Sequence, residues 1–157
     1  MINIAQKLLE LARQKKVMIA VAESCTGGLV TSAITSISGS SDVFDRGFIT
    51  YSYESKTEIL GVPQELIVTK GAVSQEVAEQ MVVGTIKSSH ANLAVAITGI
   101  AGPSGGTPSK PVGLVYIAVK YNEDVEVIEN NFQGDRNQIR TQAAEKALEL
   151  MYRKLLS

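Results

Sequence analysis

An uninterrupted apolar run at residues 17–22 breaks off into a polar turn at residues 23–28 that ends in two glycines. A short apolar run rich in β-branched residues is typical of a strand covered on both faces, as in a parallel sheet. After the turn, apolar residues recur at helical spacing as far as about Ser38, which predicts a helix. The chain is therefore expected to pass from a buried strand through a tight turn directly into a helix.

The turn combines free backbone N–H groups with small nucleophilic side chains. Ser24 or Thr26 is the expected N-cap of the following helix. A helix N-terminus attracts an anion or a developing oxyanion, and Ser24, Cys25 and Thr26 are all candidate nucleophiles. The same residue types are common in an ordinary capped loop. The turn alone is thus compatible with a catalytic site, an anion site or a structural connection.

Composition excludes several classes of function. A chain of 157 residues with a net charge of −1 lacks the electrostatic footprint of a nucleic-acid binder. One cysteine rules out an intramolecular disulfide, and with only one histidine a His/Cys metal cluster is not expected. No run approaches membrane-spanning length, and residues 1–16 lack the apolar core of a signal peptide. We therefore expect one cytoplasmic domain over residues 1–157, without a bound metal, nucleic acid or membrane.

The remaining segments alternate between helical and strand patterns. Helices are predicted at residues 2–16, 53–60, 75–88 and 136–156, and strands at 44–53, 93–98, 114–120 and 125–132. Tyr51 and Tyr53 are expected to share one face of the strand at 44–53, and the last two strands to form a hairpin. This order predicts an α/β fold with three layers, α/β/α, around a mixed, partly parallel central sheet.

A second glycine-rich segment follows the strand at 93–98. Five of the thirteen glycines lie between residues 99 and 113. Glycines allow a backbone to approach a ligand closely, although a mobile loop without function explains them equally well. In sheets with parallel strands, ligands bind at the carboxyl ends of the strands, where both glycine-containing turns are expected to lie.

Two cations stand near the expected N-termini of helices, where the helix dipole disfavours them. Lys56 falls in the first turns of the helix capped by Ser52, and Arg136 begins the last helix. A surface lysine and a solvated arginine would explain these positions without any function. An anion bound nearby would also explain the position of Arg136.

Six segments resemble, in order and spacing, the C-terminal domain of the competence/damage-inducible protein CinA. They are residues 22–28 (AESCTGG), 47–52 (GFITYS) with Lys56, 71–74 (GAVS), 99–103 (GIAGP), 110–113 (KPVG) and 134–136 (GDR). The resemblance extends from about residue 3 to the C-terminus. Stand-alone members of that family are nicotinamide-nucleotide amidohydrolases. This chain departs from the family at Tyr53, where members commonly have asparagine.

The resemblance implies hydrolysis of nicotinamide mononucleotide to nicotinate mononucleotide and ammonia, with no metal or other cofactor. It assigns Ser24 as the nucleophile, Lys56 as the general base and Tyr51 as a proton relay or orienting hydroxyl. The residues it implies for substrate binding are Cys25, Thr26, Gly27, Gly28, Thr98, Gly99, Gly102 and Arg136. It also implies a homodimer or higher homo-oligomer. The alternative is a non-catalytic nucleotide-binding module, or a regulatory module linked to competence or DNA damage.

The implied mechanism uses each unusual feature of the sequence. Desolvation or the positive end of a helix would lower the pKa of Lys56, and backbone N–H groups of residues 24–28 would hold the oxyanion. Arg136 and the loop at residues 98–106 would hold the phosphate. Cys25 is intrinsically the better nucleophile, but the resemblance assigns this role to Ser24.

Overall fold

The computed structural model describes residues 1–157 and contains five strands and six α-helices. The strands are β1 (Ile19–Glu23), β2 (Phe44–Ile49), β3 (Leu93–Gly99), β4 (Leu114–Tyr121) and β5 (Asp124–Asn131). The helices are α1 (Ile2–Lys15), α2 (Leu29–Thr35), α3 (Tyr53–Leu60), α4 (Gln64–Lys70), α5 (Gln75–Lys87) and α6 (Arg136–Leu156), with a 3₁₀ turn at Ser40–Asp42. None of these helices has the length and hydropathy that a membrane crossing requires.

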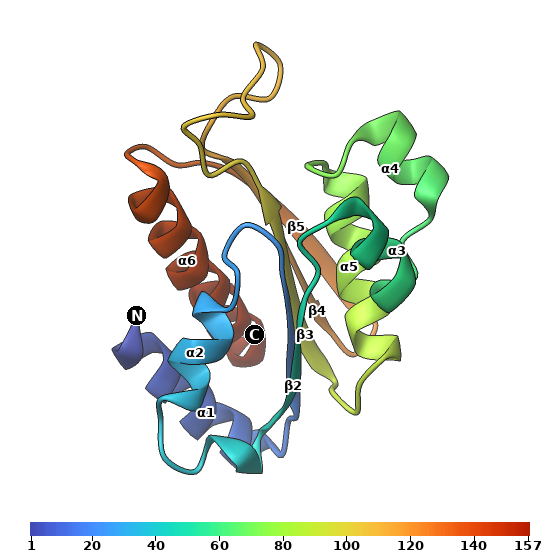
Figure 1. Ribbon diagram of the computed structural model, residues 1–157. Helices are drawn as coiled ribbons and strands as arrows, with labels where there is room; N and C mark the ends of the chain where they lie inside the picture. The colour runs from blue at the N-terminus through green and yellow to red at the C-terminus, as the bar shows by residue number, and fades with distance from the viewer.

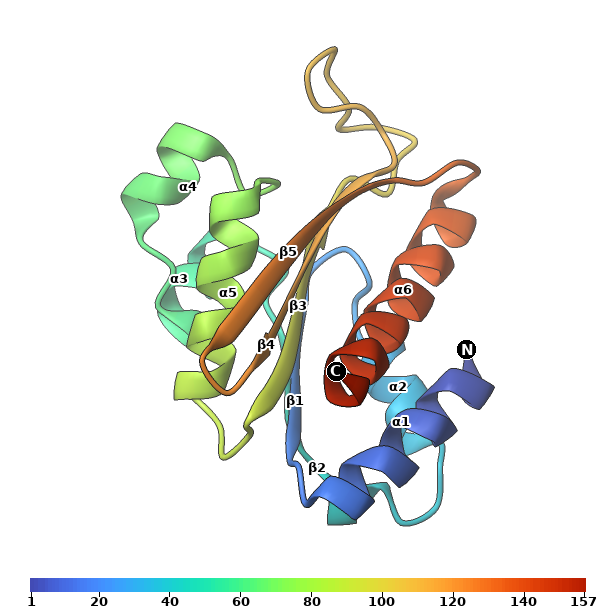
Figure 2. The same cartoon turned by 180° about the vertical axis from the view of Figure 1, so that it is seen from behind.

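The strands form one sheet in the order β2-β1-β3-β4-β5. Strand β1 pairs in parallel with β2 and β3, whereas β4 is antiparallel to both β3 and β5. Helices α1, α2 and α6 cover one face of the sheet and α3, α4 and α5 the other, as Figures 1 and 2 show from opposite sides. The predicted three-layer fold with a mixed sheet is therefore confirmed.

The two faces of the sheet pack against side chains of different size. On the side of α1, α2 and α6, a core of 27 buried residues includes the large side chains of Ile19, Val21 and Ile97. On the other side, a core of 12 buried residues is rich in alanine where α5 crosses the sheet. Helix α3 also lies very close to α5, because a Cβ on Gly84 would lie 1.9 Å from the backbone oxygen of Leu60. This close approach fixes α3 over the sheet.

Side-chain caps fix where the helices begin. Ser52 accepts a hydrogen bond from the backbone N–H of Ser55 at 3.1 Å, as its predicted capping role requires. Ser74 caps α5 in the same way, and Asp135 caps α6 in a reciprocal capping box with Gln138. Helix α3 therefore starts at a defined residue, which sets the direction of every side chain in its first turn.

The strand predicted at 44–53 is shorter than expected and ends at Ile49. Thr50 still donates its N–H to the carbonyl of Glu23, but its own carbonyl accepts a hydrogen bond from Lys56 and the chain leaves the sheet there. Tyr53 is the first residue of α3, so the prediction that Tyr51 and Tyr53 share a strand face is wrong. The helix predicted to reach Ser38 likewise ends at Thr35.

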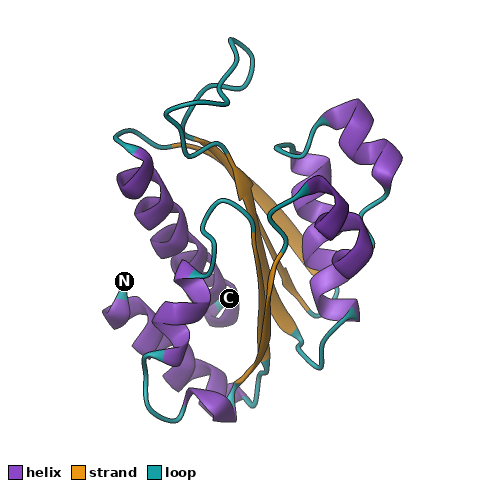
Figure 3. Cartoon of the chain, in the orientation of Figure 1, coloured by secondary structure: helices purple, strands orange, loops and turns teal.

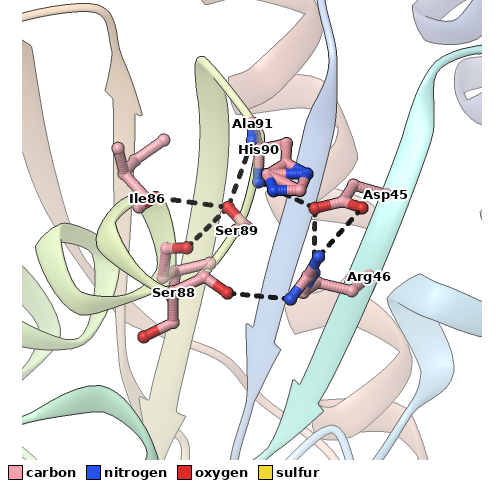
Figure 4. A network of polar contacts seen from close by, with 8 residues as sticks. Asp45, Arg46, Ile86, Ser88, Ser89, His90 and Ala91 are labelled. Atoms are coloured by element: carbon pink, nitrogen blue, oxygen red, sulfur yellow. Dashed lines mark hydrogen bonds and ion pairs between the residues drawn. The ribbon is translucent and has the colours of Figure 1, made fainter.

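At the end of the sheet where β2 begins, a small polar network connects β2 to the segment before β3 (Figure 4). Asp45 accepts hydrogen bonds from the backbone N–H of His90 at 2.8 Å and from Arg46 at 2.9 Å. The N–H of His90 is the main reason that the pKa of Asp45 lies below its ordinary value. Arg46 in turn donates to the carbonyl of Ser88. The only histidine therefore belongs to a surface connection.

Candidate active site

The first part of the site is the β1 turn, residues 23–28, which begins at the last residue of strand β1. The N-cap of α2 is Gly28, with φ 110° and no side-chain cap, so the predicted capping by Ser24 or Thr26 is wrong. The fully buried carboxylate of Glu23 takes over that role and accepts N–H groups of Val30 and Thr31 at 3.0 and 3.1 Å. The hydroxyl of Ser24 is therefore not used for capping.

Lys56 projects from the first turn of α3 onto the β1 turn. Its Nζ lies 2.9 Å from Oγ of Ser24. The same nitrogen lies 2.7 Å from the carbonyl oxygen of Thr50 and 3.3 Å from that of Tyr51. The side chain of Lys56 is 1% exposed, although lysine is seldom fully buried. The expectation of a solvated surface lysine is therefore wrong.

Burial lowers the pKa of Lys56 from its ordinary value to about 8. Loss of hydration is the main cause, because a charged ammonium loses its water when α3 packs over it. Desolvation and the positive end of a helix were both expected causes of a lowered pKa, and desolvation is the main one. A neutral amine has two N–H groups and one lone pair, so the carbonyls of Thr50 and Tyr51 can take both N–H groups. The lone pair is then left for the hydroxyl proton of Ser24.

Burial favours the neutral form of Lys56, which is the reactive one, but also the neutral form of the neighbouring thiol, which is the unreactive one. Cys25 is 6% exposed, and burial raises its pKa to about 11. The thiolate, which is the nucleophilic form of cysteine, is therefore scarce at neutral pH. Of the two adjacent candidates, Ser24 has a base within hydrogen-bond distance and Cys25 does not.

A cleft of about 310 Å³ opens above the Ser24–Lys56 pair. Its lining residues are Ser24, Cys25, Tyr51, Tyr53, Lys56, Gly71, Ala72, Val73, Thr98, Gly99, Ile100, Ala101, Gly105, Thr107, Lys110 and Arg136. Seven of the residues predicted for the site line the cleft, whereas Thr26, Gly27, Gly28 and Gly102 lie outside its wall. Lys110 and residues 71–73 also line the cleft, although no role was predicted for them; both lie in segments that resemble the family.

Arg136 lies at the mouth of the cleft and joins two of its walls. Its guanidinium donates to the carbonyl of Gly102 at 2.7 Å and to the hydroxyl of Tyr51 at 3.2 Å. No carboxylate pairs with it, so its positive charge is available to an anion. The hydroxyl of Tyr51 contacts Arg136 and neither Ser24 nor Lys56, which favours an orienting role over direct proton relay.

The hydrogen bonds of Thr98 and of the turn amides restrict what each can offer a ligand. Thr98 is 1% exposed and its hydroxyl donates to the carbonyl of Ala72, so it holds the cleft wall together. In the β1 turn, the N–H of Ser24 donates to Ile97 and that of Gly27 to Ser24. The backbone N–H groups of residues 25, 26 and 28 donate to no other residue. Those of residues 25 and 26 directly follow the hydroxyl-bearing Ser24, which makes these two the candidate oxyanion donors.

Comparison with known proteins gives a consistent family. The sequence model of the CinA C-terminal domain matches residues 1–155. The chain is 47% identical over 151 residues to a CinA-like protein of Citrifermentans bemidjiense. The aligned residues make up 96% of this chain and 36% of that protein. The chain is also 46% identical over 154 residues to a CinA-like protein of Kosmotoga olearia, covering 98% and 37%. The chain thus spans less than two-fifths of the length of these curated relatives.

Two solved structures have the same fold along nearly their whole length. The competence/damage inducible protein CihA from Agrobacterium tumefaciens superimposes with a TM-score of 0.96 at 43% identity, covering 99% of this chain and 95% of that one. A CinA superfamily protein from Klebsiella pneumoniae superimposes with a TM-score of 0.95 at 29% identity, covering 99% and 97%. With the family match over almost the entire sequence, the chain belongs to the CinA C-terminal domain family.

Proposed function

We propose that the protein hydrolyses the carboxamide of nicotinamide mononucleotide, giving nicotinate mononucleotide and ammonia. The observation that supports a hydrolase most directly is the buried pair of Ser24 Oγ and Lys56 Nζ at 2.9 Å. A protein that only bound a nucleotide would gain nothing from burying a lysine and lowering its pKa to about 8. The choice of substrate rests on the family resemblance and on the charge of the cleft.

The proposed reaction proceeds through an acyl-enzyme. Neutral Lys56 accepts the proton of Ser24, and the alkoxide attacks the carboxamide carbon. The N–H groups of Cys25 and Thr26 stabilise the oxyanion, and the protonated lysine returns its proton to the departing ammonia. Water then adds to the ester with Lys56 again as the base, which releases the carboxylate and restores the hydroxyl of Ser24. The carbonyls of Thr50 and Tyr51 keep Nζ aligned throughout.

The lining of the cleft favours an anionic substrate. Two cationic side chains besides the base Lys56, those of Lys110 and Arg136, line it, and no carboxylate does. Arg136 presents the planar guanidinium that suits bidentate binding of a phosphate. Lys110 donates to the carbonyl of Lys70, so its ammonium lies at the C-terminal end of α4. We infer that the nucleotide phosphate binds near Arg136 while the pyridine ring faces Ser24.

The proposal is tested by ammonia release from nicotinamide mononucleotide at neutral pH in the presence of a chelator. We expect turnover by the wild-type protein and none by Ser24→Ala or Lys56→Ala, with binding of the nucleotide retained in Ser24→Ala. Binding without ammonia release by the wild type would instead support the non-catalytic module. In that case Tyr53→Asn is the first variant to assay, because the family commonly has asparagine at that position.

We also propose, from the family resemblance, that the protein forms a homodimer or a higher homo-oligomer. Large apolar side chains are exposed where β2 ends and α3 begins, namely Ile49, Tyr51 and Tyr53 at 47%, 60% and 63%. A group of this kind beside a cleft is typical of an interaction surface. Light scattering on the purified protein tests the oligomer, and a monomer at micromolar concentration would contradict it.

A further inference from the structure

We propose that Arg140 is a positioning residue that orients the oxyanion-binding N–H groups of the β1 turn, an inference that rests on the proposed function. Arg140 lies one helical turn after Arg136 on α6 and does not line the cleft. Its Nε donates to the carbonyl of Cys25 at 2.9 Å and its Nη2 to the carbonyl of Thr26 at 3.1 Å. One guanidinium thus holds two consecutive peptide groups from the side away from the cleft.

The first of these hydrogen bonds fixes the N–H of Thr26 directly. The peptide between Cys25 and Thr26 is trans, so its C=O and N–H point in opposite directions. While Arg140 holds the carbonyl of Cys25, the N–H of Thr26 is directed away from α6. That N–H donates to no other residue. A peptide without this anchor could rotate and take its donor with it.

The second hydrogen bond fixes the N–H of Cys25 through two peptides. The carbonyl of Thr26 shares a peptide with the N–H of Gly27, which donates to the carbonyl of Ser24 at 3.1 Å. That carbonyl shares a peptide with the N–H of Cys25. The orientation imposed by Arg140 therefore passes through Gly27 to the donor that follows the nucleophile.

Two further features favour this role over simple packing. Arg140 forms no ion pair with a carboxylate, so its charge acts on the peptide carbonyls and polarises them, which makes the N–H groups of those peptides stronger donors. Gly27, at φ 57°, lets the guanidinium approach closely, because a Cβ there would lie 3.2 Å from Nη2. A lysine would supply the same positive charge but could not hold both carbonyls with a planar fork.

The test measures the rate at which a small fluorophosphonate labels Ser24, since this reaction places a phosphoryl oxygen at the oxyanion donors and needs no natural substrate. We expect labelling to slow by about tenfold or more in Arg140→Ala, in keeping with the loss of oriented oxyanion donors, and to recover partly in Arg140→Lys. Arg153→Ala is the matched control, because Arg153 lies on the same helix and pairs only with Glu126. Its labelling should equal that of the wild type.

A second readout separates positioning from a general loss of structure. Thionicotinamide mononucleotide develops its negative charge on sulfur, a weak hydrogen-bond acceptor that profits little from the two N–H groups. The wild type should therefore prefer the amide, and the ratio of kcat/KM for amide over thioamide should fall in Arg140→Ala. In Arg136→Ala both values should fall together and leave the ratio unchanged.

The outcomes distinguish this inference from the proposed function. Wild-type labelling with no slowing in folded Arg140→Ala, or an unchanged amide to thioamide ratio, would overturn the role of Arg140 and leave the hydrolase intact. Failure of the wild type to be labelled at all would overturn the activated serine and, with it, this inference. Should Arg140→Ala unfold, Arg140→Lys applies the same test, because it keeps the charge and most of the side chain.

Discussion

The β1 turn and the loop at residues 100–113, here called the β3 loop, follow neighbouring parallel strands but behave differently. In the β1 turn, residues 23–26 are all buried and backbone and side-chain hydrogen bonds hold them from several directions. In the β3 loop, residues 103–109 are all exposed, and the loop projects beyond the sheet (Figure 3). Similar glycine-rich sequences thus give one rigid turn, suited to bond chemistry, and one open loop, suited to contact with a substrate.

The largest expected effect concerns which side chain of the rigid turn reacts. Ser24→Ala should lower kcat by about a thousandfold or more, because no other side-chain hydroxyl is within hydrogen-bond distance of Lys56 Nζ. Cys25→Ala should retain most of the activity, since its thiol is protonated at neutral pH. Ammonia release from nicotinamide mononucleotide measures both. Loss of activity in Cys25→Ala with normal activity in Ser24→Ala would reverse the assignment.

The next effect concerns the anion at the mouth of the cleft, where Arg136 meets the base of the β3 loop. Arg136→Ala should raise KM for nicotinamide mononucleotide by about 10- to 100-fold with a smaller change in kcat, the expected cost of losing hydrogen bonds to a charged group. Steady-state kinetics on the same substrate provide both values. Arg136→Lys should be intermediate, because it keeps the charge but not the fork. A fall in kcat alone would contradict phosphate binding at this arginine.

The β1 turn and the β3 loop can also be compared by the free energy of unfolding, because each contains a side chain that accepts backbone N–H groups. Glu23→Gln should lower the free energy of unfolding by about 2 kcal/mol, because the buried carboxylate accepts two N–H groups and one hydroxyl. Thr107→Val, which removes the acceptor for Lys110 N–H in the β3 loop, should change it by less than about 0.5 kcal/mol. Urea unfolding of both variants measures the difference. Equal losses would show that the two segments are equally constrained.

A smaller effect with an unusual sign is expected for Lys56→Met. Replacement of the buried amine by a thioether of similar length should abolish turnover yet raise the free energy of unfolding at pH 7 by about 1 kcal/mol. The pKa of Lys56 is lowered in the folded state, so the unfolded chain binds more protons between about pH 8 and 10.5 and wild-type stability rises with pH there. The advantage of Lys56→Met should therefore shrink over that range. A growing advantage would contradict the lowered pKa.

The local parts of the fold were predictable from sequence. The apolar run of β1, the breaker residues after it and the caps at Ser52 and Ser74 each depend on neighbours within a few positions. The end of β2 at Ile49 was not predictable, because it depends on a hydrogen bond from Lys56, on the following helix, to the carbonyl of Thr50. No pattern within the strand itself encodes that contact.

The site was predictable only through the family resemblance. Ser24 and Lys56 lie 32 positions apart, and no local spacing brings them together. Desolvation and the helix end were both expected to lower the pKa of Lys56, and the sequence did not decide between them, because burial of Lys56 depends on how α3 packs onto the sheet. Arg140 was missed altogether. Its only signal in the sequence was a second arginine four positions after Arg136, where both side chains point to the same side of the helix.

The pH dependence of kcat/KM for nicotinamide mononucleotide tests the pairing of Ser24 with Lys56 most directly. With a pKa of about 8, roughly one lysine in ten is neutral at pH 7, against about one in three thousand for an ordinary lysine. We predict that kcat/KM rises about tenfold from pH 7 and levels off above the pKa of Lys56. A rate that does not change between pH 6 and 9, or one that still rises at pH 10, would contradict a neutral lysine as the base.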